Sequence, residues 1–200
     1  MTAPAGADGV AGAIQLRFGG SGGQGLQLSA KILAAALLRA GRTIALSQSY
    51  EPTSRGGVSR SDIVVGEGRA PADYPLATEL DFLVLLDDVA APSSLPLVRA
   101  GGLVLADASR VTLDSDGAIT TRFLPFIALA RSLGHERVAN VVALGALIAA
   151  GDFCPLAAVE AALREETPRK FLDINVEALA AGHRLVMAPL AGVPGATAGA

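Results

Sequence analysis

Apolar residues follow two alternating spacings along this chain. Short apolar runs typical of buried strands are separated by longer segments in which apolar residues recur every three or four positions. The first pair is a run at 14–18, which stops at a cluster of glycines, and a segment at 26–40 with helical spacing, after which Gly41 provides a stop. This order predicts a strand, a glycine-rich turn and a helix.

The alternation continues toward the carboxyl end. The runs predicted as strands are 43–46, 62–65, 81–86 and 102–106, with a small hairpin at 113–121 about Asp116-Gly117. The segments predicted as helices are 126–133, 138–150, 154–166 and 170–184. The last, rich in Ala, is interpreted as a lid or packing arm. Strands alternating with helices predict a Rossmann-like α/β fold: one three-layer domain whose mainly parallel sheet carries helices on both faces.

Composition limits the class of protein. The 200 residues are 51% hydrophobic, enough for one domain, which we place at 14–187 between flexible tails at 1–13 and 188–200. A formal net charge of −3 excludes a strongly basic nucleic-acid binder. The apolar stretch 138–151 falls short of the ~18 residues that indicate a membrane span, and no targeting signal is visible. We expect a cytoplasmic protein with neither nucleic-acid nor membrane partners.

The glycine cluster after the first strand is the sharpest local motif, because it fits the pattern G-x-G-x-x-G. Its members are Gly20, Ser21, Gly22, Gly23, Gln24 and Gly25. Such a turn lets backbone amides approach an anion at a helix N-terminus. No Gly-Lys-Ser/Thr follows, and only Glu51, beside Pro52, is near the position of the acidic residue that binds ribose in dinucleotide sites. The alternative is that the glycines only allow close packing of strand and helix.

A second candidate is the polar segment 49–61, which contains two arginines, a glycine pair and several hydroxyls. Arg55 and Arg60 have the forked donors that bind phosphate, and serines such as Ser59 would add hydroxyl donors. Loops after neighbouring strands of an α/β sheet meet at its carboxyl edge, so this loop and the glycine turn are expected to converge. The alternative is a polar turn or a subunit-contact loop.

No complete catalytic apparatus is visible, so no residue is assigned as catalytic and no metal site is predicted. His135 and His183 stand in charged helical surroundings typical of caps or surface positions. The acidic residues that follow strands, where helix capping is favoured, are Asp87, Asp88 and Asp107. The single Cys154 has no neighbouring His or cation to activate it, which favours a core or helix-start position. One cysteine also excludes a four-cysteine iron–sulfur site within this chain.

Taken together, the motifs resemble a known family. Four segments are similar, in the same order, to segments of the gamma subunit of 2-oxoacid:ferredoxin oxidoreductases, and the similarity extends over about residues 14–185. The segments are Phe18 to Gly25, Tyr50 to Ser61, Asp73 to Pro75 and Asn140 to Leu147. The loop reads Tyr-Glu-Pro-Thr-Ser-Arg-Gly-Gly where the common form is nearer Tyr-Gly-Pro-Glu-x-Arg-Gly-Gly. It is less similar to the His-Gly-Met form of indolepyruvate enzymes. A 2-oxoglutarate-type or aryl-glyoxylate-type complex is therefore expected.

The resemblance implies a multi-subunit enzyme that oxidatively decarboxylates a 2-oxoacid to its acyl-CoA and passes electrons to ferredoxin or to a flavin subunit. Thiamine diphosphate, Mg²⁺ and iron–sulfur clusters would be held by alpha and beta subunits, with or without a ferredoxin-like delta subunit. This chain would contribute to coenzyme A access and to assembly, without catalysing the reaction alone. The implied site residues are Gly20, Ser21, Gly22, Gly23, Gln24, Gly25, Arg55, Gly56, Gly57, Ser59 and Arg60.

Two other functions stay open at this point. The chain would be a purely structural subunit if changes in either motif left the coenzyme A kinetics of the complex unaltered. It would be a free-standing nucleotide-dependent oxidoreductase if the isolated chain bound NADH or NADPH tightly. Ala-rich helices and few charges (18% of residues) indicate that partners cover part of the surface, so we expect the chain to behave poorly alone.

Overall fold

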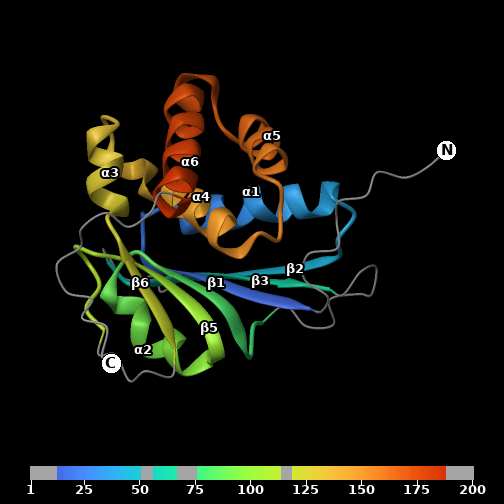
Figure 1. Ribbon diagram of the computed structural model, residues 1–200, viewed down its shortest axis with the longest axis vertical. Helices are drawn as coiled ribbons and strands as arrows, with labels where there is room; N and C mark the ends of the chain where they lie inside the picture. The colour runs from blue at the N-terminus through green and yellow to red at the C-terminus, as the bar shows by residue number, and fades with distance from the viewer. Residues whose placement is uncertain (1–12, 51–55, 67–75, 114–118, 188–200) are drawn as a thin grey trace.

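A six-stranded sheet divides the molecule into layers (Figure 1). The computed structural model describes residues 13–50, 56–66, 76–113 and 119–187. The strands are β1 (Ile14–Ser21), β2 (Ile44–Tyr50), β3 (Val58–Val65), β4 (Leu80–Leu85), β5 (Val98–Asp107) and β6 (Thr120–Leu124), in the spatial order β2-β3-β1-β4-β5-β6. The pairs β1–β4, β4–β5 and β5–β6 are parallel, whereas β3 is antiparallel to both β1 and β2. The expected mainly parallel sheet is confirmed, with β3 as the one reversed strand.

Helices cover the two faces of the sheet unequally, as Figure 1 shows. One face carries α1 (Leu26–Arg39), α3 (Phe126–Ser132), α4 (Ala139–Gly151), α5 (Leu156–Glu166) and α6 (Leu172–Met187). The other carries the short α2 (Ala91–Ser94) between the 3-10 turns η1 (Asp88–Ala90) and η2 (Leu95–Leu97). The three-layer α/β architecture predicted from the alternation is therefore confirmed.

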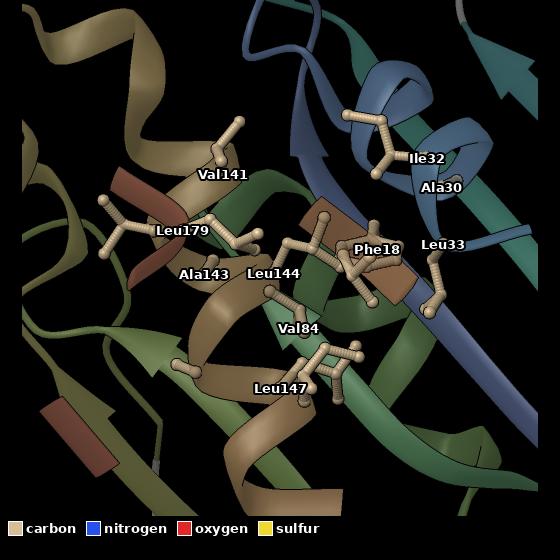
Figure 2. Close-up of a cluster of buried hydrophobic side chains, with 14 of the residues drawn as sticks. Phe18, Ala30, Ile32, Leu33, Val84, Val141, Ala143, Leu144, Leu147 and Leu179 are labelled. Carbon is tan, nitrogen blue, oxygen red and sulfur yellow. The ribbon is translucent and has the colours of Figure 1, made fainter. Parts of the chain in front are cut away.

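The larger hydrophobic core lies between the sheet and the five-helix layer. Strand side chains alternate between the two faces, so β1 directs Phe18 into this core and Arg17 toward the α2 face. Figure 2 shows Phe18 and Val84 of the sheet close to Leu144 and Leu147 of α4. Helix α4 carries apolar residues on all of its sides, because it is buried between the sheet and α6.

Several strand boundaries differ from those predicted. Residues 49–50 form the end of β2 and residues 58–61 the start of β3, although both ranges were expected in a polar loop. Each of these residues is paired with a residue of a neighbouring strand. Strand β1 likewise continues through the first glycines to Ser21. Thr120 and Thr121, expected in a hairpin, begin β6 and pair in parallel with β5. The rest of that hairpin, at 114–118, lies outside the described residues, as do the predicted tails apart from residue 13.

Helices α4 and α6 touch through glycine. A Cβ atom added to Gly182 would lie 1.8 Å from the carbonyl oxygen of Val142, and one added to Gly145 would lie 2.1 Å from that of Leu179. No side chain fits between the two backbones, so the helices approach more closely than any other residue type would allow. The Ala-rich final helix is thus a packing element of the core.

Replacing Gly182 with Ala is expected to destabilise the domain by about 2–4 kcal/mol, because the new methyl group must separate α4 from α6. The loss would occur although Ala is the better helix former by about 1 kcal/mol. Urea unfolding followed by circular dichroism measures the change. Arg184→Ala, at an exposed position of the same helix, is the control and should stay within about 0.5 kcal/mol. Equal stability of Gly182→Ala and the unmodified chain would contradict this packing.

Candidate functional site

The glycine turn after β1 is shaped by the side chain of Gln24. Its Oε1 accepts a hydrogen bond from Ser21 N at 2.8 Å, and its Nε2 donates to Leu86 O at 3.1 Å. The glutamine therefore folds back over the turn and ties it to the end of β4. A Cβ atom at Gly20 would lie 2.3 Å from Gln24 Oε1, so a side chain at this first glycine would displace the glutamine from its position over the turn.

The glycine turn and the Arg-Gly-Gly loop meet through their backbones. Gly22 N donates a hydrogen bond to Gly57 O at 2.9 Å, and Ser59 lies opposite Gly20 in the β1–β3 ladder. Gly56 has a φ of 82°, a conformation in which a side chain would be strained. Arg55 lies outside the described residues. The two motifs are adjacent, and Gly57 makes the direct contact.

Backbone donors gather where α1 begins. The amides of Gly23 and Gly25 have no hydrogen-bond acceptor among the described residues. Those of Leu26 and Gln27 belong to the first turn of the helix, which offers no internal acceptor. Gly25 makes this turn possible because its φ is 77°. The positive end of the α1 dipole and these amides together favour an anion.

Two adjoining cavities open at this helix start. The larger, about 520 Å³, is lined by Gly23, Gln24, Leu86, Ile127, Gly134, His135, Glu136, Arg137 and Ala139. The smaller, about 230 Å³, shares Gly23, His135 and Arg137 with it and is otherwise mainly apolar. Its remaining lining residues are Gly25, Leu28, Val138, Asn140, Phe171, Ile174 and Asn175. The site thus combines a larger compartment that contains charged side chains with a smaller, more apolar one.

The charged residues around the larger cavity leave one cation unpaired. Glu136 accepts a hydrogen bond from Arg131 Nε at 2.9 Å and lies 3.8 Å from Arg110 NH2. Arg137 has no carboxylate partner among the described residues. His135 Nδ1 accepts a hydrogen bond from Arg137 N at 3.1 Å, so in the neutral ring the proton is on Nε2. Arg137 and the helix start therefore place net positive charge at this cavity.

Arg60 lies away from both cavities. It lines a separate hollow of about 260 Å³ with Ser49 and Val58 of the β2–β3 hairpin and Val89, Pro92 and Ser93 of the α2 face. Side chains alternate along β3, so Ser59 and Arg60 face opposite sides of the sheet. The two motifs converge as expected, but they do so through the backbone of the loop. The side chain of Arg60 points to the α2 face of the sheet, away from the glycine turn.

Comparisons with known proteins place the chain in a family. Residues 15–185 match the family described as pyruvate ferredoxin/flavodoxin oxidoreductase. The chain belongs to this family. A curated relative, 2-oxoglutarate synthase subunit KorC of Methanocaldococcus jannaschii, is 31% identical over 86% of this chain and 92% of its own length. A ketoisovalerate oxidoreductase subunit VorA of Methanothermobacter thermautotrophicus is 30% identical over 84% of this chain but 35% of its own length.

Solved structures agree with the family assignment. The gamma subunit of a keto/oxoacid ferredoxin oxidoreductase from Geobacter sulfurreducens has a TM-score of 0.76 and 32% identity, covering 87% of this chain and 98% of that one. The resemblance to a gamma subunit, expected from the two motifs, is confirmed. A 2-oxoglutarate:ferredoxin oxidoreductase from Magnetococcus marinus, with 2-oxoglutarate, coenzyme A and succinyl-CoA bound, has a TM-score of 0.78. Its identity of 20% shows the shared fold alone, over 92% of this chain and 33% of that one.

Sequence reasoning missed one wall of the cavities in this oxidoreductase subunit. His135 was expected only as a cap or a surface residue, and neither Arg137 nor Ile127 was singled out. The available signal was a Gly-His-Glu-Arg stretch between two helices that follow β6. Only the topology shows that this stretch returns to the start of α1, more than a hundred positions earlier in the chain.

The expected capping role is confirmed for Asp87 and His135, whereas Asp88 lies within η1 and accepts a hydrogen bond from Thr112 N at 2.8 Å. Asp87 accepts a hydrogen bond from Val89 N at the start of η1, and His135 caps the 3-10 turn η3 (Glu136–Val138). Asp107 is fully buried, where its carboxylate accepts hydrogen bonds from Ile127 N at 2.8 Å and from Ser109 N at 2.9 Å. Asp107 thereby holds α3, and with it the Ile127 wall, against the end of β5.

Within the described ranges, no group of three or more His, Cys, Asp or Glu side chains is placed to hold a metal ion. None of the helices in those ranges is long and apolar enough to cross a membrane.

Cys154 is buried just before α5, as expected for a core or helix-start residue. Burial raises the pKa of its thiol from 9.0 to about 11. At pH 8 the thiolate fraction of the folded chain would therefore be about a hundredfold lower than that of an ordinary thiol.

Iodoacetamide at pH 8 is therefore expected to leave Cys154 unmodified in the folded chain and to alkylate it in urea. Mass spectrometry of timed samples measures both rates. Rapid alkylation of the folded chain would show that the thiol is ionised or accessible, contrary to its position. Raising the pH toward 11 should speed the reaction of the folded chain, because the thiolate fraction rises with pH.

Proposed function

We propose that this chain is the gamma subunit of a thiamine-diphosphate and iron–sulfur dependent oxidoreductase that converts a 2-oxoacid to its acyl-CoA. The complex would convert one 2-oxoacid, one coenzyme A and two oxidised ferredoxins into one acyl-CoA, one CO₂, one proton and two reduced ferredoxins. Two electrons leave the 2-oxoacid and each ferredoxin accepts one. This chain would help to bind coenzyme A and to assemble the complex, while catalysis occurs on partner subunits.

The observation that carries the coenzyme A role is the larger cavity at the start of α1. Coenzyme A is a strongly anionic ligand with phosphate groups and an apolar arm. Gly23 and Arg137 line both cavities, and the unpaired amide of Gly23 and the guanidinium of Arg137 suit phosphate. The smaller cavity adds the unpaired amide of Gly25 and is lined by apolar groups such as Phe171 and Ile174. Arg169 and Lys170, next to Phe171 in the chain, add exposed positive charge nearby.

Relatives support the substrate class. Four curated relatives are named 2-oxoglutarate synthase subunit KorC, and the Magnetococcus marinus enzyme contains 2-oxoglutarate and coenzyme A. Of the two types expected from the sequence, we therefore propose the 2-oxoglutarate type over the aryl-glyoxylate type. The pocket around the reacting carbonyl would belong mainly to partner subunits, which would also hold thiamine diphosphate, Mg²⁺ and the iron–sulfur clusters.

A free-standing dinucleotide-dependent enzyme is less well supported. In a dinucleotide-binding sheet the acidic residue that binds ribose follows the strand beside the first one. Here the antiparallel β3 occupies that place, and β2 (Ile44–Tyr50) contains no acidic residue. Gly22 N also donates to Gly57 O, so that amide is not available to a phosphate.

Capture of the native complex tests the proposal directly. The tagged chain, purified from its own cells without oxygen, should bring thiamine-diphosphate-binding and iron–sulfur subunits with it. The eluate should reduce a viologen dye only when both a 2-oxoacid and coenzyme A are present, and 2-oxoglutarate should be preferred over 2-oxoisovalerate and phenylglyoxylate. A chain that elutes alone, or an eluate that is active without coenzyme A, would contradict the proposal.

Arg137→Gln is expected to raise the KM of the assembled complex for coenzyme A about tenfold, because the loss of one charge-assisted hydrogen bond to phosphate is worth about 1.4 kcal/mol. The KM for the 2-oxoacid should not change. Arg164→Gln, on the exposed face of α5 and paired with Glu160, is the control and should leave both values unaltered. Arg60→Gln tests whether the separate hollow takes part. Unchanged coenzyme A kinetics in both Arg137 and Arg60 variants would favour a purely structural subunit.

A further inference from the structure

Asn140 is a buried polar residue at the start of α4, and its amide reaches across to the glycine turn. Its side chain is 3% exposed. Nδ2 donates to Gly25 O at 2.9 Å and to Ser29 Oγ at 3.1 Å, and Ser29 Oγ in turn donates to Asn140 O at 3.0 Å. The three residues form a closed set of hydrogen bonds between α4 and the first turn of α1. A polar group buried this deeply is costly unless it is bonded in this way.

These bonds join the two walls of the candidate site. Gly23, Gln24 and Gly25 form one wall, and the segment from His135 to Ala139, immediately before Asn140, forms the other. Asn140 itself lines the smaller cavity. The two walls are 115 residues apart in the chain at the Asn140–Gly25 bond, and this side chain joins them directly.

The same contact accounts for the last glycine of the motif. A Cβ atom at Gly25 would lie 2.8 Å from Asn140 Nδ2, in addition to the strain of its φ of 77°. Gly25 O also accepts hydrogen bonds from Leu28 N at 3.0 Å and Ser29 N at 3.2 Å. The start of α1 therefore keeps its own hydrogen bonds when Asn140 is changed. What is lost is the pair of bonds that the side-chain amide makes from α4, while Ser29 Oγ can still donate to the backbone oxygen of residue 140.

We propose that Asn140 is a positioning residue for the anionic ligand of this site: it holds the backbone amides at the start of α1 at the correct distance from Arg137. The inference rests on the proposed function, because the ligand is taken to be coenzyme A. A ligand that contacts both walls binds best when their spacing is fixed before binding. Without the amide, part of the binding energy must order the two walls.

The experiment compares three variants in the assembled complex. Asn140→Leu keeps the size of the side chain and removes its donor. Ser29→Ala removes the hydroxyl that accepts from the amide and that donates to Asn140 O. Val159→Ala, a buried change in α5 that lines neither cavity, serves as the control for lost stability. Coenzyme A KM, 2-oxoacid KM, kcat and thermal stability are measured for each.

Asn140→Leu is expected to raise the KM for coenzyme A about tenfold and Ser29→Ala by a smaller factor, with kcat and the 2-oxoacid KM unchanged. Val159→Ala should lower thermal stability without moving either KM. If Asn140→Leu and Ser29→Ala lower stability while the coenzyme A KM stays at the unmodified value, the residue is structural and the inference is overturned. If Asn140→Leu prevents assembly of the complex, Ser29→Ala is used instead, because it retains the bond from Asn140 to Gly25. A coenzyme A KM at the unmodified value in Ser29→Ala would then overturn the inference.

Arg137→Gln separates this inference from the proposed function. If Arg137→Gln raises the coenzyme A KM and neither Asn140→Leu nor Ser29→Ala does, only the positioning role fails. If none of the three changes the coenzyme A KM, the cavity is not the coenzyme A site and the proposed role of the chain fails as well.

Discussion

The ion pair between Arg17 and Asp62 fixes the part of the sheet on which the site depends. Arg17 Nε and NH2 donate to the two carboxylate oxygens of Asp62 at 2.6 and 2.8 Å, and both side chains are almost wholly buried. Arg17 NH1 also donates to Ser93 O at 3.0 Å, which joins the pair to the α2 face. Removal of one partner would leave an unpaired buried charge, a change that typically costs about 3–5 kcal/mol. Buried pairs of this kind specify an arrangement more reliably than they add stability.

The arrangement specified here is the register of the reversed strand. Arg17 and Asp62 lie directly opposite each other in the antiparallel β1–β3 ladder. A shift by one residue would move Asp62 to the other face of the sheet, among the apolar groups of the main core. With the pair formed, β3 begins at Val58 beside Ser21, and the preceding Gly57 presents its carbonyl oxygen to Gly22 N. The meeting of the two sequence motifs therefore follows from an ion pair four to five residues away on each strand.

Features that repeat along the chain could be predicted from the sequence, and features that depend on strand order could not. Helices α1, α3 and α5 begin and end close to the predicted positions because their apolar spacing is local information. The reversed direction of β3 has no local signal, since Val58 to Ser61 has the composition of a polar loop and becomes a strand only by pairing with its neighbours. The position of Arg60 on the α2 face follows from that pairing and was likewise inaccessible. For the same reason Arg137, distant in sequence, was not connected with the glycine turn.

The glycine turn illustrates how one motif can serve a different purpose in a different sheet. In a dinucleotide-binding fold the glycines bring the backbone close to a pyrophosphate. Here Gly20 is needed by the side chain of Gln24 and Gly25 by that of Asn140, so two of the three motif glycines accommodate amide side chains of this same chain. Both amides secure the turn, Gln24 to the end of β4 and Asn140 to the start of α4. What remains for a ligand is the unpaired amides of Gly23 and Gly25 and those of the first turn of α1, held between these two attachments. Helix α4 in turn packs closely against α6 at Gly145 and Gly182, so the bond from Asn140 ties the glycine turn to the most closely packed pair of helices in this layer.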